Sequence, residues 1–163
     1  MIHMDSDESR YMMKPGYLMI YKDQLTVYGV CGSGMFIALW DSEKEYSGCC
    51  YFLYPRPLNN QHYTAKYGTV ALRHLVQSMQ EHGSEIRNLK AHLIGAGVLE
   101  DNKFGTQNEI AALEVLVEFD ISIISHDTGG GLARKFVYDT KTGENITMKV
   151  HNIRNKDWYP YNG

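Results

Sequence analysis

Short segments rich in β-branched and aromatic residues, separated by turn residues, constrain the fold of this chain more than any other feature. In the first half they run from Tyr17 to Tyr21, Gln24 to Val30, Met35 to Trp40 and Cys49 to Leu53. Segments of this length and composition favour β-strands over helices. We therefore expect the N-terminal half to be mostly sheet.

The second half mixes helical and strand patterns. Apolar residues at helical spacing before Gly83 predict a helix from Tyr67 to His82. Thr106 and Glu109 have the spacing of a capping box and predict a second helix from about Gln107 to Glu118. Strands are predicted at Lys90 to Ile94, Ile121 to Ser125, Arg134 to Tyr138 and Ile146 to Val150. The fold class is therefore α+β.

The length of the chain indicates one domain. With 163 residues, of which 44% are hydrophobic, it can bury a single core. We place this domain at residues 14–150, between a mobile N-terminal tail at 1–13 and an aromatic C-terminal tail at 151–163. The longest apolar run, Met35 to Trp40, is far shorter than the ~20 residues that span a bilayer. We expect a cytoplasmic protein without membrane insertion.

Charge and ligand patterns exclude several classes of site. The net charge of -3 offers no basic surface for a phosphate backbone, so nucleic acid is not an expected partner. The seven histidines show no ligand spacing with cysteines or carboxylates, so we expect no metal site. The glycine-rich loop Gly29 to Gly34 precedes a strand-like run and lacks the lysine of a phosphate-binding loop. No cofactor is expected.

An ordered series of motifs covers nearly the whole chain, from about Lys14 to Val150. It includes Gly32-Ser33-Gly34 followed seven residues later by Asp41, and then Gly48-Cys49-Cys50-Tyr51. Gly105-Thr106-Gln107-Asn108 follows, and the most specific part is His126-Asp127-Thr128-Gly129-Gly130 with the trailing Ala133-Arg134. The series resembles the chemoreceptor glutamine deamidase family CheD.

The resemblance implies a CheD-like β-sandwich of two mixed sheets with helices packed on the outside. It also implies a reaction, in which a cysteine thiolate attacks a receptor glutamine, an imidazole transfers the proton and a threonine orients the pair. Amides are poor electrophiles, so this chemistry needs an activated thiolate and protonation of the departing ammonia.

At the positions that the resemblance assigns to these three groups, this chain has other residues. Gly34 stands at the nucleophile position, Tyr51 at the imidazole position and Tyr28 at the threonine position. A glycine cannot attack, and a phenol with a pKa of about 10 is a poor base at neutral pH. We therefore expect no intact catalytic residue and no enzyme, but a pseudoenzyme that binds or regulates a protein in chemotaxis-type signalling.

The expected binding surface is the old cleft, with Tyr28, Ser33, Gly34, Tyr51 and Thr128. The resemblance implies two partners for it, the glutamine-bearing cytoplasmic helices of chemoreceptors and a CheC-type phosphatase. Aromatic residues in the C-terminal tail leave homo-oligomerisation open.

An alternative retains hydrolysis with a relocated nucleophile. Side chains alternate faces along a strand, so Cys49 shares a face with Tyr51 while Cys50 points to the other side. Cys49 is then the candidate thiol for a changed deamidase or esterase that acts on receptor glutamine or methylglutamate.

Overall fold

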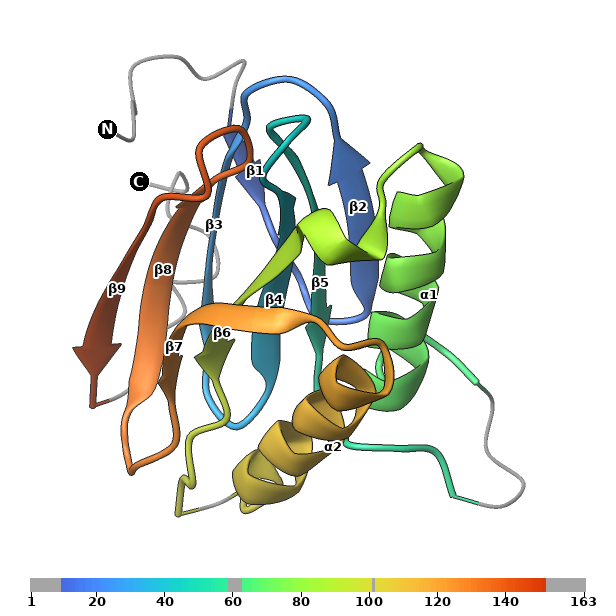
Figure 1. Ribbon diagram of the computed structural model, residues 1–163. Coiled ribbons are helices and arrows are strands. Elements are labelled where there is room, and N and C mark those ends of the chain that lie inside the picture. The colour runs from blue at the N-terminus through green and yellow to red at the C-terminus, as the bar shows by residue number, and fades with distance from the viewer. Residues whose placement is uncertain (1–9, 59–62, 101, 152–163) are drawn as a thin grey trace.

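The computed structural model describes residues 10–58, 63–100 and 102–151 and has three layers (Figure 1). A four-stranded sheet packs against a five-stranded sheet, and helices cover the other face of the five-stranded sheet. The helices are α1 (Gly68–Glu81) and α2 (Gly105–Glu118), with the short 3-10 helix η2 (Ile86–Asn88) leading into β6.

The four-stranded sheet contains both ends of the described chain. Its order is β1 (Arg10–Met12), β3 (Thr26–Cys31), β8 (Ala133–Asp139) and β9 (Asn145–Val150). The strand β1 runs parallel to β3, whereas the β3–β8 and β8–β9 pairs are antiparallel, so the sheet is mixed.

The five-stranded sheet forms the middle layer. Its order is β2 (Tyr17–Tyr21), β5 (Tyr46–Phe52), β4 (Met35–Asp41), β6 (Leu89–Gly95) and β7 (Ser122–Thr128). Only the β6–β7 pair is parallel, and its register shifts at a bulge between Ala91 and His92. This sheet is therefore mixed as well.

Alternating side chains of the middle sheet supply two separate hydrophobic cores. One face of β4 and β5, with Ile37, Leu39 and Phe52, packs on Leu72 and Leu75 of α1. The opposite face contributes to a core between the sheets, formed by Met13, Leu25, Val27, Cys31, Phe36, Ala38, Cys49, Tyr51, Ile94, Phe136 and Tyr138. Burial on both faces explains why most side chains of β4 and β5 are apolar rather than alternating with polar ones.

The α+β class and the sandwich of two mixed sheets with outer helices are confirmed. The N-terminal segment 1–13, expected to be a mobile tail, contains ordered structure at its end. Arg10–Met12 pairs with β3, and Met13 is fully buried. Residues 1–9 and 152–163, which include most of both expected tails, lie outside the described residues.

The predicted capping box is wrong. The N-cap of α2 is Phe104, no side chain caps the helix, and Thr106 lies within its first turn. The helix begins earlier, at Gly105, where the backbone lies close to the preceding loop: a Cβ on Gly105 would lie 2.2 Å from the Gly97 carbonyl oxygen, so this position requires glycine. Among the described residues, no helix is long and apolar enough to cross a membrane.

Candidate functional site

The loop between β3 and β4 crosses from one sheet to the other, and Gly34 lies at its end. A Cβ on Gly34 would lie 2.6 Å from the Phe52 carbonyl oxygen and 3.1 Å from the Tyr51 ring. The Gly34 carbonyl oxygen accepts a hydrogen bond from the Ala96 amide at 2.9 Å. Residue 34 is thus enclosed by β5 and the chain after β6, and only glycine fits this backbone without a shift.

Tyr51 occupies the space between the sheets beside Gly34. Its hydroxyl donates a hydrogen bond to the Val30 carbonyl oxygen at 2.7 Å, and only 1% of the residue is exposed. Burial raises the pKa of the Tyr51 phenol well above its usual value, with a further contribution from the nearby Cys31. Tyr51 is therefore a neutral, packed side chain that joins β5 to β3. We call Ser33, Gly34 and Tyr51 the Gly34 site.

Tyr28 lies apart from the Gly34 site. Its neighbours Val27 and Gly29 face the core between the sheets, which places the Tyr28 side chain on the outer face of the four-stranded sheet. There the Arg10 guanidinium lies 4.9 Å from the centroid of the Tyr28 ring. The structure thus brings Ser33, Gly34 and Tyr51 together but does not bring Tyr28 to them.

Thr128 lies at the same end of the sheets as Gly34. It pairs with Gly95 at the end of β6, and the Gly129 amide donates to the Gly95 carbonyl oxygen at 3.0 Å. The following glycine bend is held by Arg134, which is 2% exposed and donates to the carbonyl oxygens of Gly129 at 2.6 Å and Leu132 at 2.7 Å. This arrangement explains why the motif combines a glycine run with an arginine.

All three cysteines are buried. Cys49 and Tyr51 face the core between the sheets and Cys50 faces the helices, as the alternation predicts. Burial raises the pKa of the Cys49 thiol well above its usual value, and raises those of Cys31 and Cys50 to about 12. Cys31, which the sequence reasoning did not select, is the thiol whose charge contributes to the raised pKa of Tyr51, and its Sγ lies 3.7 Å from the Ile94 carbonyl oxygen.

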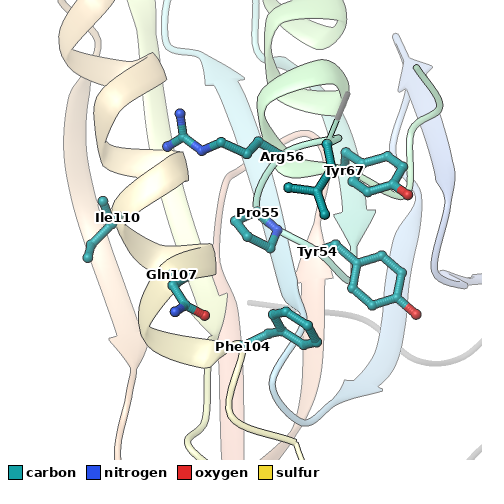
Figure 2. A pocket seen from close by; sticks show the side chains of 8 residues that line it. Tyr54, Pro55, Arg56, Tyr67, Phe104, Gln107 and Ile110 are labelled. Atoms are coloured by element: carbon teal, nitrogen blue, oxygen red, sulfur yellow. The ribbon is translucent and has the colours of Figure 1, made fainter. Parts of the chain in front are cut away.

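A groove of about 510 Å³ lies between the segment after β5 and the start of α2. Figure 2 shows its lining, in which side chains from the segment after β5 face the start of α2. The lining residues are Tyr54, Pro55, Arg56, Leu58, Tyr67, Phe104, Gln107 and Ile110. Rings of Tyr54 and Phe104 meet edge to face with centroids 5.5 Å apart, and those of Tyr54 and Tyr67 are 5.7 Å apart. We call this the aromatic groove.

Asn108 connects the aromatic groove to the Gly34 site. It is fully buried, and its side-chain amide donates to the carbonyl oxygens of Ser33 at 2.8 Å and Leu53 at 2.9 Å. One side chain therefore fixes both the loop that carries Gly34 and the strand end that leads to Tyr54. The sequence reasoning missed Tyr54, Phe104 and Asn108 as site residues, although Asn108 belongs to one of the motifs that carry the resemblance.

Among the described residues, no three or more His, Cys, Asp or Glu side chains are grouped so that they could hold a metal ion.

Comparisons with known proteins identify the family. Residues 55–149 match the family model described as "CheD chemotactic sensory transduction". The chain belongs to the CheD family. A relative from Clostridium novyi (strain NT), named "Probable chemoreceptor glutamine deamidase CheD", is 30% identical over 149 residues, which cover 86% of this chain and 91% of the relative.

Two further relatives carry the same name or nearly so. The protein from Trichlorobacter lovleyi is 27% identical over 139 residues, covering 82% of this chain and 86% of the relative. The "Chemoreceptor glutamine deamidase CheD" of Thermotoga maritima is 25% identical over 122 residues, covering 73% and 78%.

These names contradict the expectation that the chain is not an enzyme. The relatives are named for a glutamine deamidase, which is an enzyme, and nothing in the comparisons or the structure shows this chain to be inactive. The expectation rested on three substituted positions, which the resemblance assigned to the reacting groups. In the structure, Tyr28 does not lie beside Gly34 and Tyr51, so the three positions do not form one site.

Proposed function

We propose that this protein acts in chemotaxis signalling by binding the glutamine-bearing cytoplasmic helices of a chemoreceptor in the aromatic groove. The proposal also places the protein in the cytoplasm, where that part of a receptor lies. Membership of the CheD family and the receptor in the relatives' names support the partner. The aromatic groove is the single observation that supports the proposed position of the binding site on the protein.

The chemistry of the groove suits a helix that carries glutamines. Aromatic side chains in mutual contact offer apolar anchors, and aromatic anchors in well-packed pockets commonly dominate binding energy. Gln107 and Arg56 add polar groups at its edge, where they can meet side-chain amides and carboxylates. A CheC-type phosphatase is the other protein partner that this surface could take.

Calorimetric titration with a purified cytoplasmic fragment of a receptor from the same organism tests this function. We expect Phe104→Ala to weaken binding about tenfold, or about 1.4 kcal/mol, because Phe104 provides an anchor in the groove. Ile146→Ala is the matched control, since Ile146 is 64% exposed on β9, outside the groove, and its loss is expected to leave affinity unchanged. Binding that is insensitive to Phe104→Ala, or no binding, would contradict the proposal.

Deamidation of receptor glutamine is the second candidate function, and the relatives' names favour it. Mass spectrometry of the same fragment after incubation measures it directly, as conversion of a glutamine amide to a carboxylate. The variants Cys49→Ala and Cys31→Ala report which thiol such a conversion uses. A conversion that survives both substitutions points to a group other than these two thiols.

A further inference from the structure

The solvent-facing side of α2 carries a stripe of exposed apolar residues. Ile110, Leu113 and Val117 are 48%, 38% and 77% exposed. Their i, i+3, i+7 spacing aligns them along one side of the helix, opposite the buried Asn108, Ala112 and Val115. A helix that already buries one face in its own core thus presents a second apolar face.

This stripe is continuous with the aromatic groove. Ile110 lines the groove and also a shallower depression that it shares with Leu113, Glu114 and Val117. From Phe104 at the head of α2 to Val117, the apolar surface extends about 20 Å at 1.5 Å per residue. An α-helix of about 13 residues has the same length. We call Phe104, Ile110, Leu113 and Val117 the α2 docking surface.

Carboxylates lie along both sides of the α2 docking surface. Glu109 is on one side, and Glu114 and Glu118 are on the other. Glu114 pairs with Arg56 at 2.6 Å and Glu118 pairs with Arg73 at 3.0 Å, so the flanking charge is acidic on balance but partly neutralised. A partner with basic residues beside its apolar stripe complements this surface.

The same charges and the small area disfavour a second copy of this chain. Pairing α2 with itself would bring the acidic flanks of both copies together. The four side chains of the docking surface are only 38% to 77% exposed, so four such residues make a small patch compared with the roughly 20–30 residues and ~800 Å² per partner in a stable complex of folded proteins. A single amphipathic helix, laid into a groove by three or four anchors, matches this area better.

We propose that the α2 docking surface binds an amphipathic α-helix of a partner protein, about 13 residues long, with apolar side chains at i, i+3, i+4 and i+7 and lysine or arginine beside them. This inference rests on the proposed function, because the α2 docking surface shares Phe104 and Ile110 with the aromatic groove. The helix lies along α2, with one end over Phe104 and the other over Val117.

Two synthetic peptides of about 14 residues test this, with identical leucines at i, i+3, i+4 and i+7 and either lysines or glutamates beside them. In amide NMR spectra we expect the lysine peptide to shift residues along α2 from Ile110 to Val117, and the glutamate peptide to bind at least tenfold more weakly. Val117→Gln should weaken binding of the lysine peptide about tenfold. Ile146→Gln, at an apolar position on β9 that is 64% exposed against 77% for Val117, should not weaken it. Glu109→Gln should reduce the preference for lysine.

Other outcomes overturn the proposal. They are equal binding of both peptides, shifts confined to residues away from α2, or a dimer of the protein alone that Val117→Gln dissociates in sedimentation experiments. If a receptor fragment still binds with Phe104-dependent affinity while the lysine peptide leaves α2 unshifted, only this inference fails. If the lysine peptide binds along α2 and the receptor fragment does not bind, the proposed function fails instead.

Discussion

The Tyr51 hydroxyl donates a hydrogen bond to the Val30 carbonyl oxygen at 2.7 Å and thereby joins the two sheets beside Gly34. Tyr51 belongs to β5 of the five-stranded sheet, and Val30 belongs to β3 of the four-stranded sheet. Because the bond lies in the core between the sheets, water cannot replace it without opening the sandwich. The position that the resemblance assigned to a proton-transferring imidazole is thus a structural contact between layers.

Removal of this hydroxyl tests that contact. We expect Tyr51→Phe to lower the free energy of unfolding by about 1–2 kcal/mol, because the aromatic packing stays and a buried hydrogen bond is lost. Urea unfolding followed by circular dichroism measures the change. Tyr63→Phe is the matched control at a residue that is 80% exposed, and we expect it to change stability by less than about 0.5 kcal/mol. Equal effects at both positions would argue against the contact.

The second prediction concerns the tight packing around Gly34. A methyl group at residue 34 would lie 2.6 Å from the Phe52 carbonyl oxygen, and that backbone atom cannot move without disturbing β5. We expect Gly34→Ala to destabilise the protein by about 1–3 kcal/mol, as overpacking of a tight core does. Gly131→Ala is the control, because a Cβ there meets nothing within 4 Å and the backbone needs no positive φ. Thermal unfolding of both variants compares them, and a stable Gly34→Ala protein would show that the loop is looser than described.

The cysteines give a prediction about accessibility. Cys31, Cys49 and Cys50 are buried with raised thiol pKa values, so the reactive thiolate is scarce and shielded in the folded protein. We expect no rapid reaction with a thiol reagent such as DTNB at pH 8, and reaction of all three thiols after unfolding in guanidinium. Fast labelling of one cysteine in the folded protein would identify an open thiol, and peptide mapping would show which one it is.

The sequence predicted the elements well but the sites poorly, and the reason is physical. Strand and helix patterns are local, so β2 was predicted with its observed bounds and α1 within one residue at each end. The direction in which a side chain points is also local once a strand is known, which is why the separate faces of Cys49 and Cys50 were correct.

Which residues meet across the fold is not local. The resemblance grouped Tyr28 with Gly34 and Tyr51, but the Tyr28 side chain lies on the outer face of the four-stranded sheet, away from both. The aromatic groove joins Tyr54 to Phe104, fifty residues apart in the chain, through packing that no periodicity records. The start of α2 was also misplaced, because the helix begins at Gly105 without a capping side chain, and the close approach of Gly105 to Gly97 is a tertiary contact that the local sequence does not show.

His92 gives the last prediction, which concerns pH. It lies between the sheets with its Nδ1 atom 2.6 Å from the Ser125 hydroxyl oxygen, while its buried Nε2 atom has no hydrogen-bond partner among the described residues. Burial lowers the pKa of His92 from 6.5 to about 4, since an imidazolium there would be poorly solvated. The folded state therefore holds His92 neutral in a range where the unfolded chain binds a proton.

The sign of the pH effect follows from this difference in proton binding. The free energy of unfolding keeps the full contribution of neutral His92 above pH 6.5. As the pH drops toward about 4, protonation of His92 in the unfolded chain lowers that free energy by roughly 2–3 kcal/mol. Urea unfolding at several pH values measures the slope. In His92→Gln the slope across this window should become shallower, although the variant is less stable at pH 7 because it disrupts the contact with Ser125. An unchanged slope would mean that His92 is not the residue whose protonation opposes folding, since the remaining carboxylates would then account for the whole acid sensitivity.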